Sequence, residues 1–185
     1  MTEPIDRQSV EVSADVREVL RRRRESLARA EDDSPPVDTV ALLVFDLGDQ
    51  RYAVPADAVH EVQAGYTVAR IPCTPAHILG VMSVRGEIVS VTDLGALLDV
   101  PTGLSRARPA SARPAILVAE GPVSSALVVD DIVDIIDVPA SALEPPLALA
   151  DRRQAPLLRA SVEIDGRMVA VVDCATLLEP IDSTV

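Results

Sequence analysis

A strand–turn–strand–helix unit occurs twice in the chain, and this repeat constrains the fold more than any other feature. In the first copy, residues 78–98, two short β-branched runs flank Arg85-Gly86-Glu87. Gly86 can take the positive φ that a tight hairpin needs. The second run then changes to helical spacing, and Asp93 is placed to act as the N-cap of one or two helical turns.

The second copy lies further along the chain at a constant offset, without a gap. This offset aligns the turn glycines, the capping aspartates and the helix leucines: Gly86 with Gly166, Val89 with Val169, Val91 with Val171, Asp93 with Asp173, Leu97 with Leu177 and Leu98 with Leu178. We therefore predict two similar lobes, at about residues 39–98 and 113–180, with room for the chain to cross between them. The shared Gly86, Gly166, Asp93 and Asp173 are assigned structural roles.

Short apolar segments surround the repeat. A first hairpin is expected over residues 40–54, and further strands at residues 59–62, 115–119, 125–129, 132–138 and 157–164. Strands at a spacing of about 8 to 12 residues, joined by Gly and Pro turns, indicate small barrels rather than a parallel α/β sheet. We predict an all-β fold with short helices, and an aliphatic core because aromatic residues make up only 2% of the chain.

Residues 1–38 differ in composition from the rest and are predicted to form an N-terminal extension. A capping Ser13 and the stripe of Val16, Val19, Leu20 and Leu27 predict a helix at about residues 13–30, ended by an acidic, proline-rich stretch. The run Arg21 to Arg24 is offset by nearby acids, so we read it as a solvated helix face. Docking of this helix on a partner is the alternative.

Composition limits the partners and the compartment. The formal net charge of −12 opposes general binding to nucleic acid or to an anionic membrane surface. No apolar run reaches the roughly 18 residues of a membrane span, and the N-terminus does not resemble a signal peptide. Cys73 and Cys174 lack metal-ligand spacing and fit buried, reduced thiols. We expect a cytoplasmic protein with protein partners and no direct insertion into a membrane.

Residues suited to catalysis are scarce. His60 and His77 are the only histidines, and neither has a zinc-pair spacing or a clear nucleophile beside it. The acids at 130, 131, 134 and 137 lack the glycine and closing glutamate of a calcium loop, so they are read as a turn and the solvated face of a strand. We expect no enzyme activity, no metal and no cofactor.

Arg85 is the remaining candidate for function. It lies in the turn of the first hairpin, where its planar guanidinium could bind a carboxylate or a carbonyl of a partner. Its counterpart in the second copy is Asp165, so the fold shared by the copies does not require an arginine there. This difference favours recognition over a structural role.

Three blocks in this order resemble the CheW family of bacterial chemotaxis coupling proteins: LVFDLGDQRYAVPADAVHEV, IPCTPAHILGVMSVRGEIVSVTDLGALL and ILVAEGPVSSALVVDDIVDII. The resemblance covers about residues 38–180. It implies two intertwined five-stranded, SH3-like barrels, with residues 39–180 as the CheW-like domain. It also implies a non-enzymatic adaptor that joins the helical tips of chemoreceptors (methyl-accepting chemotaxis proteins) to the regulatory domain of the CheA histidine kinase, with recruitment to membrane receptor arrays.

The resemblance also assigns receptor-binding positions. Val59, Glu61 and Arg85 would face the receptor from the first lobe, and Ala126 and Ile135 would lie near it from the second. Ser83 stands where the family usually has Asn, and Ala126 where it has Gly; both exchanges bear on the choice of receptor.

Three other functions remain as alternatives. One is a specialised CheW-like adaptor for motility, development or another output, with the N-terminal helix as an added docking element. Another is an enzyme or small-ligand receptor that uses the space between the lobes, and the last is nucleic-acid binding through Arg21 to Arg24.

Overall fold

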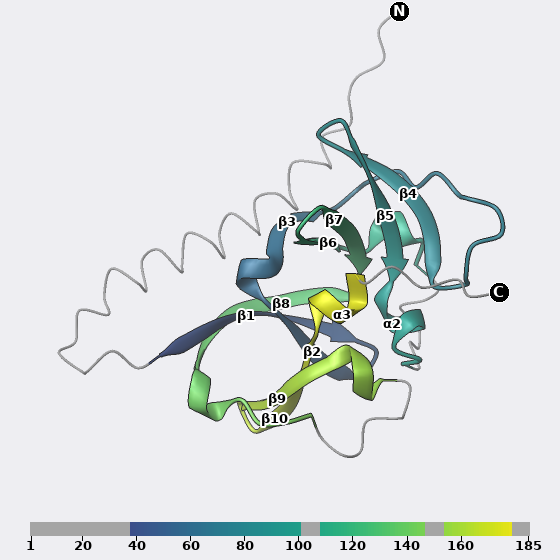
Figure 1. Ribbon diagram of the computed structural model, residues 1–185. Coiled ribbons are helices and arrows are strands. Elements are labelled where there is room, and N and C mark those ends of the chain that lie inside the picture. Colours follow the sequence, from purple (N-terminus) through teal and green to yellow (C-terminus); the bar gives the residue numbers. More distant parts are fainter. Residues whose placement is uncertain (1–37, 101–107, 147–153, 179–185) are drawn as a thin grey trace, which may run out of the picture. The chain divides into compact units, whose positions relative to one another are not determined.

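The computed structural model describes residues 38–100, 108–146 and 154–178. The predicted helix at residues 13–30 and the run Arg21 to Arg24 lie outside these ranges. Ten strands are joined by short helices (Figure 1): β1 (Thr39–Leu47), β2 (Gln50–Pro55), η2 (Ala56–Ala58), β3 (Val59–Gln63), β4 (Ile78–Val84), β5 (Glu87–Asp93), α2 (Leu94–Leu97), η4 (Ala110–Ala112), β6 (Ala115–Glu120), β7 (Val123–Val128), β8 (Asp131–Pro139), η5 (Ala140–Ala142), η6 (Ala155–Leu157), β9 (Leu158–Ile164), β10 (Arg167–Val172) and α3 (Cys174–Leu178). Within the described ranges, no helix has the length and apolarity to cross a bilayer.

The strands form two five-stranded sheets, which confirms the all-β prediction. We call the sheet with strand order β8-β1-β2-β10-β9 sheet A, and the sheet with order β3-β6-β7-β5-β4 sheet B. Each sheet combines the first two strands of one predicted lobe with the last three strands of the other, so the chain crosses between the sheets twice. Isolated bridges from Ala69 to Val81 and from Glu144 to Ser161 help to close the sheets into barrels.

Three apolar clusters follow from the alternation of side chains along the strands. On β1, Leu42 and Val44 point into the interior of sheet A, while Leu43 and Phe45 enter a second cluster shared with sheet B. A third cluster fills the interior of sheet B. The shared cluster is the largest and holds both barrels together, and Phe45 stacks on Tyr52 within it with ring centroids 6.4 Å apart.

The two repeated hairpins have the same turn. The φ angles are 51° at Arg85 and 89° at Gly86, and 52° at Asp165 and 73° at Gly166. A two-residue turn with positive φ at both positions suits the twist of a hairpin. The sequence predicted the positive φ at Gly86 but not at Arg85. Aspartate tolerates this region better than arginine does, so Arg85 occupies a disfavoured backbone conformation.

Gly80 marks a close approach of two chain segments in the first hairpin. Its φ is 143°, and a Cβ at this position would lie 2.2 Å from the carbonyl oxygen of Ala69. Ala69 forms the bridge to Val81 that helps to close sheet B, with backbone hydrogen bonds of 2.8 and 2.9 Å in the two directions. Only glycine fits here, because it has no Cβ.

Candidate partner-binding site

Arg85 forms an ion pair with Glu61 across the two outer strands of sheet B. Arg85 Nη2 lies 2.5 Å from Glu61 Oε2, and Gln63 Nε2 donates to the other carboxylate oxygen at 2.7 Å. The Arg85 side chain is 81% exposed, whereas that of Glu61 is 19% exposed. Glu61 is therefore held by two donors, and most of the Arg85 guanidinium still faces solvent.

This ion pair contributes little to the fold. Exposed ion pairs of this kind stabilise a protein by roughly 0 to 1 kcal/mol. The positive φ of Arg85 adds a backbone cost of similar size. The stabilisation by the ion pair is therefore offset by the cost of the backbone conformation. The remaining N–H donors of Arg85 can bind a carboxylate or a carbonyl of a partner.

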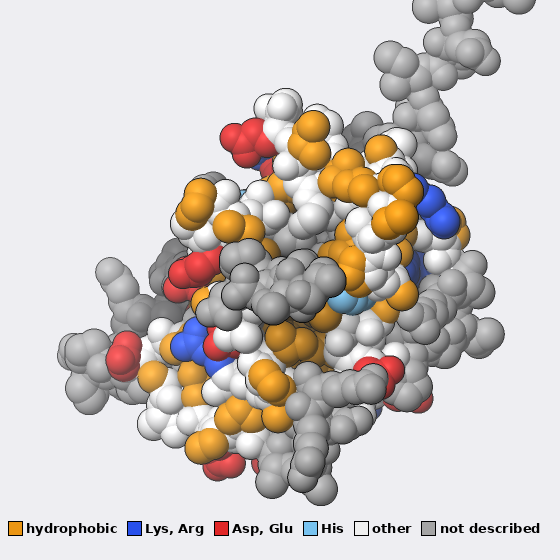
Figure 2. All heavy atoms as spheres, turned by 45° about the vertical axis from the view of Figure 1, so that its right-hand side comes forward, with side chains coloured by type: hydrophobic (Ala, Val, Ile, Leu, Met, Phe, Trp, Pro, Cys, Tyr) orange, Lys and Arg blue, Asp and Glu red, His pale blue; other side chains and the backbone are white. Residues whose placement is uncertain are grey.

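Half-buried apolar side chains lie on the strand that carries Glu61 and on its counterpart in sheet A. Val59 and Val62 on β3, and Ile132 and Ile135 on β8, pack against the margin of the shared core cluster. A partner that covered them would remove apolar surface from water, at roughly 25 cal/mol per Å². Figure 2 shows further hydrophobic side chains exposed over the upper part of the view, on the side where β4 and β5 lie in Figure 1.

Two other predicted contact residues differ sharply in exposure. Ser83 is exposed on β4, opposite Ile88 on β5, whose side chain is 76% exposed. Ala126 is 0% exposed, which corrects the expectation that it lies on a binding surface. It lies on β7, between β5 and β6, and the alternation of that strand turns its methyl group into the interior of sheet B.

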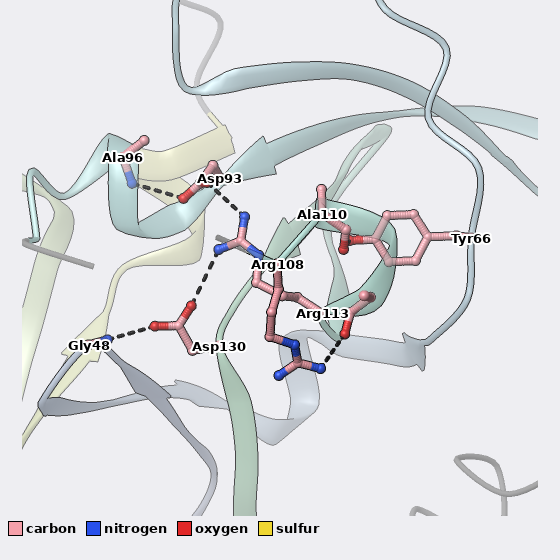
Figure 3. A network of polar contacts seen from close by, with 9 residues as sticks. Gly48, Tyr66, Asp93, Ala96, Arg108, Ala110, Arg113 and Asp130 are labelled. Carbon is pink, nitrogen blue, oxygen red and sulfur yellow. Dashed lines mark hydrogen bonds and ion pairs between the residues drawn. The ribbon is translucent and has the colours of Figure 1, made fainter. Parts of the chain in front are cut away.

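A buried ionic network around Arg113 was not predicted from the sequence (Figure 3). Arg113 Nη2 lies 2.9 Å from Asp93 Oδ2, and Nη1 lies 3.3 Å from Asp130 Oδ1. The second oxygen of Asp93 accepts a hydrogen bond from Ala96 N at 3.0 Å, which caps α2. The second oxygen of Asp130 accepts from Gly48 N at 2.7 Å. Both carboxylates therefore use one oxygen for arginine and one for the backbone.

Arg113 keeps its positive charge despite burial. Arg113 is 3% exposed, and burial alone would lower its pKa. Hydrogen bonds to Asp93 and Asp130, with their negative charges, outweigh burial and raise the pKa of Arg113. Nearby, Tyr66 donates to Ala110 O at 2.7 Å, and burial is the main cause that raises the pKa of Tyr66 to about 12.

Weak signals for this network were present in the sequence. Arg113 and Pro114 directly precede the apolar run of β6, and Asp130 directly follows that of β7. From the sequence, Asp130 was expected to belong to a turn and the solvated face of a strand, together with the acids at 131, 134 and 137. Asp131 and Asp134 do fit that reading, since both are exposed. Asp130 does not, because it is 8% exposed.

No cluster of three His, Cys, Asp or Glu suited to a metal occurs among the described residues. His60 is exposed on β3. Cys73 is exposed rather than buried, which corrects the expectation for that residue, and Cys174 is buried. Burial is the main cause that raises the pKa of the Cys174 thiol to about 11, so it is neutral at pH 7. The arrangement offers recognition through Arg85 and its apolar neighbours.

A family model described as CheW-like domain matches residues 41–181. The chain belongs to the CheW-like family. It is 32% identical over 135 residues to the chemotaxis protein CheW of Rhizobium meliloti (strain 1021), covering 71% of this chain and 83% of that protein. It is 29% identical over 143 residues to a probable chemotaxis protein CheW of Rhizobium etli, covering 77% and 89%.

One further relative and one solved structure extend this comparison. The chain is 32% identical over 103 residues to protein FrzA of Myxococcus xanthus, covering 55% of this chain and 61% of that protein. The crystal structure of the scaffolding protein TtCheW from Thermoanaerobacter tengcongensis matches with a TM-score of 0.68 at 23% identity, covering 78% of this chain and 95% of that one. This match supports the CheW-like fold of two barrels.

Proposed function

We propose that this CheW-like chain is a non-enzymatic adaptor in chemotaxis signalling, which couples the cytoplasmic tips of chemoreceptors to the regulatory domain of a CheA-type histidine kinase. It would work in the cytoplasm, gathered at membrane receptor arrays. The observation that supports this role best is the exposed Arg85, held at a turn by Glu61 beside half-buried apolar side chains.

A helical receptor tip fits these features. An amphipathic helix binds through apolar side chains on one face and polar groups at its margin. Val59 and Ile135 supply apolar surface from two strands, and Arg85 with Glu61 supplies a donor and an acceptor that can fix the register of the helix. Ser83, exposed two residues before Arg85, adds a short hydroxyl next to this pair.

The test measures binding and stability on the same variants. Arg85→Ala should weaken binding of a purified receptor tip by about tenfold or more, because arginine anchors at interfaces contribute on the order of 1 to 2 kcal/mol. Its melting temperature should stay within error of the wild type, because the ion pair is exposed. Binding of the kinase regulatory domain serves as the second readout.

Arg159→Ala is the matched control, since Arg159 is exposed on β9 in the other sheet. It should leave receptor binding unchanged. Equal binding by both variants would refute the role of Arg85, and an unfolded Arg85→Ala protein would refute recognition as its main purpose.

A specialised adaptor for another output is the second candidate, favoured by the similarity to FrzA. Residues 1–37 would then act as an added docking element. Removing them should abolish binding of one partner and leave the melting temperature of the CheW-like domain unchanged. Unchanged partners would contradict this role of the extension.

A further inference from the structure

Asp130 lies where the chain passes from sheet B to sheet A. It follows β7, a strand of sheet B, and directly precedes β8, a strand of sheet A. Its backbone N–H donates to Asp46 O at 3.1 Å, and its carboxylate accepts from Gly48 N at 2.7 Å. Both contacts anchor the crossover on the β1–β2 hairpin of sheet A.

Arg113 connects this anchor to sheet B. It precedes β6, and it bridges Asp130 to Asp93, the last residue of β5. Both β5 and β6 are strands of sheet B. One buried guanidinium therefore joins the end of a sheet B strand to a crossover that is fixed on sheet A, as Figure 3 shows.

Stability alone does not account for this arrangement. The side chains of Arg113, Asp93 and Asp130 are only 3%, 6% and 10% exposed, and Arg113 Nε has no hydrogen-bond partner among the described residues. Removing charges from water costs several kcal/mol per ion, and an apolar replacement of a whole buried network is often no less stable. The network does, however, impose a defined geometry, because each contact is directional.

The other crossover is built differently. The chain passes from β2 to β3 through Pro55 and the short helix η2, and the acid in that helix, Asp57, is exposed. Pro55 has a φ of −56°, so this connection is fixed locally by its ring and by the helical turn. The crossover at Asp130 has no helix and depends on Arg113 for its connection to β5.

We propose that Arg113 is a positioning residue that fixes the orientation of sheet A relative to sheet B. Strand β8 starts directly after Asp130 and carries Ile135, whereas β3, with Val59 and Glu61, lies in sheet B. The spacing of these two strands therefore depends on the network. The consequence for receptor binding rests on the proposed function, while the orientation itself does not.

Two variants separate orientation from stability. Arg113→Met leaves two buried carboxylates without their cation and should lower the midpoint of urea unfolding strongly. The triple variant Arg113→Met, Asp93→Asn, Asp130→Asn removes all three charges and keeps an oxygen for Ala96 N and for Gly48 N. It should recover most of the lost stability. Arg108→Met is the control, because Arg108 is exposed and its hydrogen bond among the described residues is local, to Ala112 O.

Orientation is measured as a distance between spin labels on the two sheets. Labels at Glu87→Cys on β5 and Glu163→Cys on β9 occupy exposed sites, with Cys73→Ser to remove the exposed native thiol. The distance distribution should be narrow in the wild type and in Arg108→Met, and clearly broader or shifted in the triple variant. A second label pair within sheet A, Asp134→Cys with Glu163→Cys, should stay narrow throughout.

A triple variant that is folded and keeps the narrow distribution between the sheets would overturn the proposal. If the distribution broadens, receptor binding is compared next. Weaker binding that is not accompanied by loss of stability would extend the positioning role to the proposed site. Unchanged binding would leave the orientation result intact and would count against β3 and β8 acting together on one partner.

Discussion

The two hairpin–helix units, residues 78–98 and 158–178, share a backbone and differ in chemistry. Their turns have the same φ pattern, and their strands pair in the same register, with Ser83 opposite Ile88 and Glu163 opposite Met168. Both end in a short helix capped by aspartate. The features they share are therefore those required by the hairpin and its cap.

Three of the positions at which the two units differ can be compared by paired substitutions. The turn carries Arg85 in one copy and Asp165 in the other. The edge strand of the unit, β4 or β9, carries Gly80 or Ala160. The cap is either Asp93, which binds Arg113, or Asp173, which accepts hydrogen bonds from the backbone N–H groups of Ala175 and Thr176. At the turn and at the cap, the first copy has side-chain contacts with other segments, to Glu61 and to Arg113. Substitutions at paired positions of the two copies can measure what each difference contributes.

The largest difference is expected at the caps. Asp93→Ala removes the cap of α2 and leaves Arg113 buried with one carboxylate fewer, so the free energy of unfolding should fall by about 3 to 5 kcal/mol. Asp173→Ala removes a cap only and should cost about 1 kcal/mol. Urea unfolding of both variants measures the difference. Equal losses of unfolding free energy in the two variants would show that the ion pair with Arg113 contributes no stability beyond the helix cap.

A smaller difference is expected on the edge strands β4 and β9. Gly80→Ala places a Cβ 2.2 Å from Ala69 O at a φ of 143°, so it should lower the free energy of unfolding by about 2 kcal/mol or more. The reverse change at the equivalent site, Ala160→Gly, should cost about 1 kcal/mol through chain entropy. Melting temperatures from thermal unfolding compare the loss of stability in the two variants. A wild-type melting temperature for Gly80→Ala would mean that the Ala69 bridge can move aside.

Features set by residues close together in the sequence could be predicted, whereas features set by contacts between distant segments could not. The turn at Gly86 and the two capping aspartates are set by neighbours within a few residues, and the repeat made them visible. Each sheet contains strands from both predicted lobes, and this arrangement depends on pairing between strands that are far apart in the sequence. Local sequence patterns do not specify such pairing. The burial and pairing of Arg113 and Asp130 were not predicted for the same reason, because their partners Asp93 and Gly48 lie far away in the sequence. Ala126 was misplaced because family resemblance gives a position in sequence and not the side of the strand it faces.

The smallest effect on stability, and the sharpest test of function, is expected at the turns. Arg85→Asn removes the exposed ion pair with Glu61 but suits positive φ better, so the free energy of unfolding should change by less than about 1 kcal/mol. The matched change Asp165→Asn should be neutral within about 0.5 kcal/mol. Titration of both variants with a receptor tip should then show a loss of affinity for Arg85→Asn alone. The same loss in both variants would mean that the two turns are equivalent for binding, and that the exchange of arginine for aspartate between the copies does not reflect recognition.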